Sequence, residues 1–280
     1  MFDVNFKPEH INAGREDFEG NDGIGRYIFF PGSDGRAKAI AEHFAHLKVK
    51  KHPRGHNLYM GTIKNGNHKV EVASVSSGMG TPSLDIIFNE LVNLGAKRFL
   101  RVGTAGLLQK YIKENDFVVG TAAVRDEHAS RAYVPLEYPA VASIEFVQSA
   151  INAAHNLKVM DRTHAGILHS KSSLYAREFE AGPMAEANKD YMDVLRRSGV
   201  IASEMEASAL FVLASVFDHQ LRQKGQGREF RIAAGAVCGI VGEGAAFATK
   251  EERAKLNKEL IELSLESVIE LSKHEHKYLW

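Results

Sequence analysis

The chain has 280 residues, of which 44% are hydrophobic, and its 35 Lys and Arg residues balance its 35 Asp and Glu residues. A chain of this length and composition can bury a substantial core, and it fits one large α/β domain better than two ordinary domains. The formal net charge of zero argues against proteins that coat nucleic acid or lie on a membrane surface, because both classes usually carry a basic excess.

The N-terminal segment 1–25 is polar and rich in glycine. It predicts an irregular arm ahead of a single domain over 26–280. The segment has no apolar signal core, and no stretch of the chain approaches the length of a membrane span. We therefore expect a cytoplasmic protein that contacts neither a membrane nor nucleic acid.

The first predicted strand is the apolar run 27–30, which ends at Pro31 and Gly32. A turn at 34–36 follows, and 37–44 has helical composition. This strand–turn–helix unit can present backbone N–H groups to an anion at the turn.

A second strand is predicted over 70–76, and a glycine-containing turn leads into a helix from Pro82 to about Leu94. The next strand, 98–103, ends in Thr104, Ala105 and Gly106. Strands that alternate with helices as far as a C-terminal helix near 250–273 predict an α/β fold with a largely parallel central sheet. Ligands usually bind at the carboxyl ends of such strands.

The segment 213–231 passes from an apolar helix into a polar stretch, 218–227, which predicts a surface loop ahead of a strand over 232–238. That strand contains Cys238, the only cysteine. A single cysteine excludes an intrachain disulfide and favours an intracellular location.

Three arginines occupy positions suited to anion binding. Arg36 follows the first turn, Arg54 lies in a polar segment ahead of a strand, and Arg101 lies inside a strand with apolar neighbours. A buried Arg101 needs an anionic partner, because burial of an unpaired charge costs several kcal/mol. With the hydroxyl of Thr104, the three could clamp a phosphate. Alternatively, Arg101 faces out or pairs with a carboxylate and the other two are surface charges, which spacing alone favours.

Two carboxylates, Glu204 and Glu206, flank Met205 at the start of an apolar helix over 207–216. Acidic residues near a helix N-terminus are favoured by the helix dipole. Alternatively, one carboxylate accepts hydrogen bonds from two ligand hydroxyls while Met205 packs on an apolar ligand face. The residues alone favour the dipole explanation.

Nothing in the sequence indicates a metal or an organic cofactor. The thirteen histidines show no pair at metal-ligand spacing. The glycines at 78–80 and 103–106 lack the pattern and downstream acid of a dinucleotide fingerprint. We expect neither a metal nor an organic cofactor.

Taken in order, these segments resemble the uridine phosphorylases of the nucleoside phosphorylase superfamily. The resemblance spans 27 to about 270 and is carried by segments 31–36, 76–83, 99–106, 123–130, 135–142 and 204–210. The run from Pro135 to Ala142 is less like the purine-specific relatives. One departure lies in the first turn, where Ser33 and Asp34 stand in place of the family's Asp-Pro.

The resemblance implies a single three-layer α/β/α domain with a mixed, largely parallel central sheet. It also implies phosphorolysis of a nucleoside, with uridine and phosphate giving uracil and ribose 1-phosphate in pyrimidine salvage and nucleoside catabolism. Inorganic phosphate is then a co-substrate.

The resemblance assigns a role to each matching residue. The phosphate-binding residues are Gly32, Arg36, Arg54, Arg101 and Thr104. The ribose-binding residues are His10, Thr104, Met205 and Glu206. The base-binding residues are Ala105, Gly106, Tyr175, Arg177 and Glu204. Arg36, Arg101 and Glu206 are the expected catalytic residues. Because Arg54 and His10 act from a neighbouring subunit in the family, at least a homodimer with shared active sites is expected.

The predicted base pocket departs from the family pattern. The Gln and Arg that recognise uracil are not in place within 172–179, where Arg177 is the candidate substitute. The acidic residue of the purine enzymes is also missing after the strand 232–238, where Gly239 and Ile240 stand. A purine nucleoside phosphorylase therefore remains an alternative.

Two further alternatives are a hydrolytic nucleosidase and a non-catalytic ligand-binding relative. The three arginines argue against the hydrolase, because a water nucleophile needs no anion clamp. The altered base pocket motivates the non-catalytic alternative.

Overall fold

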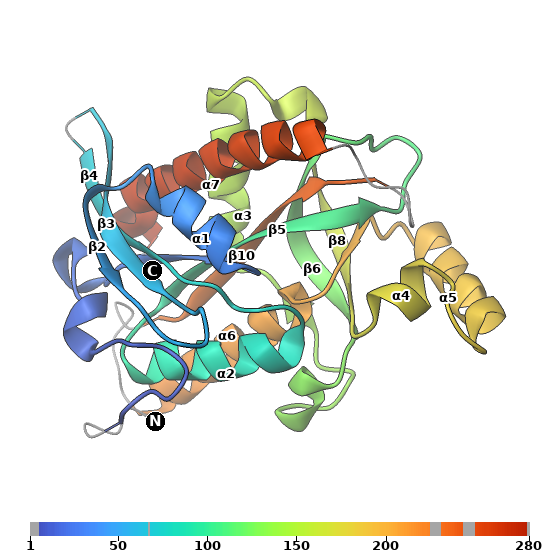
Figure 1. The fold of residues 1–280 in the computed structure, drawn as a ribbon, viewed down its shortest axis with the longest axis horizontal. Helices are drawn as coiled ribbons and strands as arrows, with labels where there is room; N and C mark the ends of the chain where they lie inside the picture. The colour runs from blue at the N-terminus through green and yellow to red at the C-terminus, as the bar shows by residue number, and fades with distance from the viewer. Residues whose placement is uncertain (1–5, 67, 225–230, 243–249, 279–280) are drawn as a thin grey trace.

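The computed structural model describes residues 6–66, 68–224, 231–242 and 250–278. In this part of the chain, ten strands form one mixed sheet with helices on both faces (Figure 1). The strands are β1 Tyr27–Pro31, β2 Ala45–Lys50, β3 Leu58–Asn65, β4 His68–Ser74, β5 Arg98–Leu107, β6 Phe117–Asp126, β7 Ala140–Val141, β8 Thr163–Lys171, β9 Ala202–Glu204 and β10 Ala233–Ile240. The helices are α1 Asp34–Ala41, α2 Thr81–Asn93, α3 Ile144–Asn156, α4 Leu174–Glu178, α5 Ala185–Arg197, α6 Ala207–Gln223 and α7 Lys250–Tyr278.

The sheet follows the order β10-β6-β8-β9-β5-β1-β4-β3-β2, and β10 also pairs with β5. This second pairing closes β10, β6, β8, β9 and β5 into a ring, while β1, β4, β3 and β2 extend from it as an open sheet. β1 is parallel to both β4 and β5, and β10 is parallel to β5. The α/β class and the mixed, largely parallel sheet are confirmed.

Strands β1 and β10 are buried at every residue. Helices cover both faces of the sheet, which accounts for the apolar sequences of these two strands. One core cluster joins the sheet to α2 and α6, and a second joins its other face to α1, α3 and α7. Figure 1 shows the same division, with α2 and α6 on one side and α3 and α7 on the other.

The prediction for the segment after residue 213 needs a correction. We expected a surface loop over 218–227, but α6 continues to Gln223. Leu213, Phe217 and Leu221 are all buried at four-residue intervals, and this apolar stripe extends the helix through the polar stretch. Residues 225–227 of the expected loop lie outside the described residues.

The described part of the N-terminal segment packs against the domain. It contains two short 3₁₀ turns, Arg15–Phe18 and Asn21–Gly23. Ile11 and Phe18 are buried in the cluster that includes α2 and α6. The domain boundary at residue 26 stays a prediction. Within the described residues, no helix has both the length and the apolar character needed to cross a membrane.

Candidate functional site

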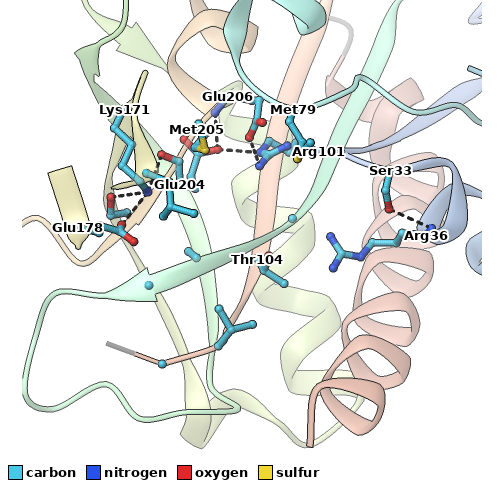
Figure 2. A pocket seen from close by; sticks show the side chains of 18 residues that line it. Ser33, Arg36, Met79, Arg101, Thr104, Lys171, Glu178, Glu204, Met205 and Glu206 are labelled. Atoms are coloured by element: carbon cyan, nitrogen blue, oxygen red, sulfur yellow. Dashed lines mark hydrogen bonds and ion pairs between the residues drawn. The ribbon is translucent and has the colours of Figure 1, made fainter. Parts of the chain in front are cut away.

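A pocket of about 300 Å³ lies at the carboxyl ends of β1, β5 and β9. Most of the predicted site residues line it: Gly32, Arg36, Arg101, Thr104, Ala105, Gly106, Glu204, Met205 and Glu206. These residues come from three distant parts of the chain. Figure 2 shows Arg36 on one side, Arg101 and Glu206 in the middle, and Lys171 with Glu178 on the opposite side.

Arg101 is buried in β5 and is paired with carboxylates while it lines the pocket. Its Nε donates to Glu204 Oε2 at 2.8 Å, and its Nη2 forms an ion pair with Glu206 Oε2. Burial by itself disfavours the charge, but Glu206 and Glu204 outweigh it and raise the pKa of Arg101 above its ordinary value. Nη1 has no hydrogen-bond partner within the described residues. Arg101 is therefore a fixed cation with one nitrogen still unsatisfied.

The carboxylate of Glu204 is occupied within the chain. It accepts hydrogen bonds from the backbone N–H of Glu206 at 2.8 Å and of Ala207 at 2.9 Å, and also from Ser170 Oγ. These contacts satisfy donors at the start of α6, which agrees with the helix-dipole explanation for this residue. Together with the bond from Arg101, they leave Glu204 suited to hold Arg101 and α6 in place.

Glu206 is held at both oxygens. Oε1 accepts from the backbone N–H of Gly80 at 2.6 Å, and Oε2 pairs with Arg101. Burial raises the pKa of Glu206, and the nearby charge of Arg101 opposes that effect. Met205 lines the pocket beside it. The arrangement gives a carboxylate and a thioether in fixed positions at the centre of the pocket.

Arg36 lies in the first turn of α1 and lines the same pocket. Ser33 caps this helix by accepting from the backbone N–H of Arg36 at 3.3 Å. The guanidinium is fixed by Nε, which donates to Asn257 Oδ1 of α7 at 2.8 Å, and by Nη1, which donates to the carbonyl of Val102 at 3.3 Å. Burial and the charge of Arg101 lower the pKa of Arg36. Two cations that repel each other across one pocket favour an anion between them.

Two charged residues that were not predicted from the sequence lie on the side of the pocket opposite Arg36. Lys171 ends β8, Glu178 ends α4, and the two form an ion pair with Nζ and Oε1 2.7 Å apart. Lys171 also donates to Ser203 Oγ at 3.0 Å and to the carbonyl of Glu204 at 3.3 Å. The position of Lys171 at the carboxyl end of a strand was the available signal, because ligands usually bind there.

Two predicted base-binding residues lie away from this pocket. Tyr175 is 69% exposed and packs against Phe179. Arg177 lines a different pocket, where two of its nitrogens bind Asp126 at 2.6 and 2.9 Å and its guanidinium lies 4.2 Å from the centre of the Tyr191 ring.

A chain of hydrogen bonds joins the two pockets through β8. Ser203 Oγ, which accepts from Lys171, lies 2.9 Å from His169 Nδ1. His169 Nε2 lies 3.0 Å from Asp126, which also binds Arg177. Burial opposes the charge of Asp126, but hydrogen bonds from His169 and Arg177 prevail and lower its pKa. Because the Asp126 carboxylate accepts, Nε2 of His169 is the donor in this hydrogen bond.

Arg54 and His10 also lie outside the pocket of their own chain. Arg54 is exposed in the segment between β2 and β3. His10 lies against α2, where its Nδ1 is 2.7 Å from Glu90 Oε1, and the same carboxylate accepts from the backbone N–H groups of Glu9, His10 and Ile11. Their expected positions in a neighbouring subunit's site stay predictions.

Within the described residues, no three His, Cys, Asp or Glu side chains are grouped so that they could hold a metal ion. The prediction that the protein uses no cofactor remains a prediction.

Known proteins resemble this chain over most of its length. The family model described as "Phosphorylase superfamily" matches residues 26–272. Uridine phosphorylase of Treponema pallidum is 35% identical over 194 residues, covering 69% of this chain and 73% of the relative. Uridine phosphorylase of Thermococcus kodakarensis is 33% identical over 220 residues, covering 78% and 73%. A DeoD-type purine nucleoside phosphorylase of Pectobacterium atrosepticum is 30% identical over 266 residues, covering 93% and 96%.

Proposed function

The chain belongs to the phosphorylase superfamily, and on that premise we propose that it is a nucleoside phosphorylase, a pentosyltransferase that converts uridine and phosphate into uracil and ribose 1-phosphate. The observation that carries the proposal is the convergence of Arg36, Arg101 and Glu206 on one pocket. The similarity to uridine phosphorylases of two distant organisms supports uridine as the substrate.

In the proposed reaction, phosphate binds between Arg36 and Arg101, with the backbone of Gly32 and the hydroxyl of Thr104 nearby. The unsatisfied Nη1 of Arg101 supplies a donor for it. Guanidinium groups bind phosphate oxygens in a fixed fork geometry, so the nucleophile is oriented as well as bound.

The bond between the anomeric carbon and the base nitrogen breaks first, and its electron pair leaves with the base. Positive charge then grows on the sugar, and the phosphate dianion beside it stabilises that charge. A phosphate oxygen forms the new bond to the anomeric carbon. Fixing phosphate and sugar together contributes ~7–11 kcal/mol in favourable cases.

Glu206 is proposed to accept hydrogen bonds from the sugar hydroxyls, and Met205 to pack on the apolar face of the sugar. The ion pair between Arg101 and Glu206 joins the phosphate site directly to the sugar site. Arg101 therefore orients the sugar-binding carboxylate as well as the nucleophile. The reaction needs no metal or organic cofactor in this scheme.

Purine nucleoside phosphorolysis is the second candidate. The observation that favours it is the DeoD-type relative, which matches nearly the whole chain at 30% identity. The phosphate and sugar sites would be shared by both activities, so the difference lies in the base.

Hydrolysis of the nucleoside is disfavoured, because Arg36 and Arg101 form an anion site that a water nucleophile does not require. Binding without turnover is the remaining alternative.

We also propose that the protein acts in the cytoplasm, in pyrimidine salvage and nucleoside catabolism, as a homodimer or larger assembly with shared active sites. The buried thiol of Cys238 and the absence of a second cysteine fit a reducing compartment. Arg54 supports a shared site, because it is an exposed cation that does not line the site pocket of its own chain.

A panel of nucleosides assayed with and without phosphate tests the proposed function. We expect uridine to be cleaved only when phosphate is present, with ribose 1-phosphate as the sugar product. Cleavage of inosine in preference to uridine would favour the purine activity. Cleavage without phosphate would identify a hydrolase, and binding without cleavage of any nucleoside would contradict an enzymatic role.

A further inference from the structure

We propose that Glu178, oriented by Lys171, recognises the base by accepting a hydrogen bond from a protonated ring nitrogen. The site would then accept bases with a ring imide or amide N–H, such as uracil and hypoxanthine, and reject cytosine and adenine. The inference rests on the proposed function, since it concerns the base end of the same pocket.

The position of the ion pair between Lys171 and Glu178 supports this assignment. Arg36 and the pair lie on opposite sides of the pocket, and Arg101, Glu206 and Met205 lie between them (Figure 2). A phosphate, a sugar and a base must occupy the pocket in that order, because the sugar carbon that reacts lies between the other two. If phosphate binds at Arg36 and Arg101, the base lies beside Lys171 and Glu178.

The ammonium of Lys171 is surrounded by oxygens of its own chain. Nζ donates to Ser203 Oγ and to the carbonyl of Glu204, and it lies 2.7 Å from Glu178 Oε1 in an ion pair. The side chain is only 2% exposed. Lys171 therefore acts as a fixed cation that positions Glu178, and it is not a group that a base can bind.

Glu178 presents its carboxylate to the pocket. A Cβ atom added to Gly106 would lie 3.3 Å from Glu178 Oε2 and 3.5 Å from Oε1, so the carboxylate approaches a part of β5 that carries no side chain. An ionised carboxylate is an acceptor only. The group offered to the base is thus an oxygen that needs a donor.

The bases differ in what they present to such an oxygen. Uracil carries a hydrogen on N3 and hypoxanthine carries one on N1, each next to a carbonyl, whereas cytosine N3 and adenine N1 carry a lone pair next to an amino group. A lone pair facing a carboxylate leaves both groups unpaired, and sites built around a hydrogen bond reject the wrong partner strongly for that reason. The pair thus takes the place of the Gln and Arg that are missing from 172–179.

The first test changes the substrate and leaves the protein intact. In 3-methyluridine the ring N–H is replaced by a methyl group, while 5-methyluridine keeps it. We expect kcat/KM for 3-methyluridine to fall at least about a hundredfold below that for uridine, with a much smaller change for 5-methyluridine. Equal kcat/KM values for 3-methyluridine and uridine would overturn the proposal.

The second test is Glu178→Gln, because an amide can present either an oxygen or an N–H to the base. We expect the preference for uridine over cytidine, as a ratio of kcat/KM values, to shrink by about tenfold or more. Glu180→Gln is the matched control, since Glu180 is exposed, lies outside the pocket and undergoes the same chemical change. A preference that is unchanged in Glu178→Gln would overturn the proposal.

Failure of the proposed function gives a different result. If the wild-type protein cleaves no nucleoside in the presence of phosphate, the proposed activity is wrong, and calorimetric binding still tests the inference. Preferential binding of uridine over cytidine that is lost in Glu178→Gln and kept in Glu180→Gln would support it. Equal binding of uridine and cytidine by the wild-type protein would overturn it.

Discussion

Arg101 is a charged side chain buried in the middle of a strand, and its surroundings explain why it is tolerated there. Glu204 satisfies one edge of the guanidinium and Glu206 another, which offsets much of the cost of removing the charge from water. Removing Arg101 altogether would leave two buried carboxylates without their cation, so an alanine variant would test stability as well as activity. A lysine at position 101 would keep the positive charge but would lack the planar guanidinium group.

We therefore expect Arg101→Lys to fold and to lower kcat/KM for phosphate by about a hundredfold, because a single ammonium cannot bind Glu204, Glu206 and phosphate in the same geometry. Steady-state kinetics at varied phosphate concentration would measure the loss. Arg222→Lys is the matched control, since Arg222 is exposed on α6 and pairs with Asp218 one turn away. Near-normal phosphate kinetics in Arg101→Lys would exclude Arg101 from the phosphate site.

The residues that come directly from the matched motifs could be identified from the sequence alone. Gly32, Arg36, Arg101, Thr104, Met205 and Glu206 all line one pocket. The predicted base-binding residue Arg177 does not line this pocket, whereas Lys171 and Glu178, which were not predicted, do. Arg177 and Glu178 are adjacent in sequence, and on the short helix α4 they point to different pockets. Sequence spacing does not fix the rotation of a one-turn helix.

Helices α1 and α7 meet beside Arg36 at one side of the pocket. Arg36 extends from the first turn of α1, and Asn257 of α7 accepts from its Nε at 2.8 Å. These residues are 221 positions apart in the chain, so α7 contributes to the site through a contact that no local motif contains.

This contact predicts the behaviour of Asn257→Ala. Without its acceptor on α7, Arg36 samples more rotamers, and binding phosphate must restrict them again. We expect KM for phosphate to rise about three- to tenfold, which corresponds to the usual worth of one hydrogen bond, with a smaller change in kcat. Lys258→Ala, an exposed neighbour on the same helix, is the control. An unchanged KM would show that Arg36 needs no support from α7.

The main elements followed from local patterns in the sequence. The helix predicted from Pro82 to about Leu94 is α2 Thr81–Asn93, and the C-terminal helix predicted near 250–273 is α7 Lys250–Tyr278. The error lay in α6, where a run of polar residues was given more weight than the buried stripe of Phe217 and Leu221. The closure of β10 onto both β5 and β6 could not be predicted, because register between distant strands is set by tertiary packing.

One chain lines the site pocket with residues from several elements, yet two residues expected there lie elsewhere. Arg54 is exposed between β2 and β3, and His10 is held by Glu90 of its own chain. In a symmetric dimer, a residue of one chain can complete the site of the other, and the exchange is mutual.

We therefore expect the protein to sediment as a dimer or a larger assembly, and Arg54→Ala to lower kcat/KM for phosphate at least about tenfold. Mixed dimers of Arg54→Ala and Arg101→Lys subunits contain one site with neither change. If equal amounts of the two variant subunits assemble at random, half of the dimers are mixed and each of these has one unchanged site. The preparation would then recover about a quarter of the wild-type activity. A monomer in sedimentation velocity, or no recovery in subunits co-expressed to form mixed dimers, would contradict a shared site.

The hydrogen-bonded chain from Lys171 through Ser203, His169 and Asp126 to Arg177 has a consequence for how substrate preference can change. Its far end is supported by Tyr191 and Asn188 of α5, which lie outside the site pocket. A shift at either residue can pass along the chain to the orientation of the Lys171 ammonium. Laboratory evolution toward a new nucleobase would thus find useful substitutions on α5 as well as among the residues that face the ligand.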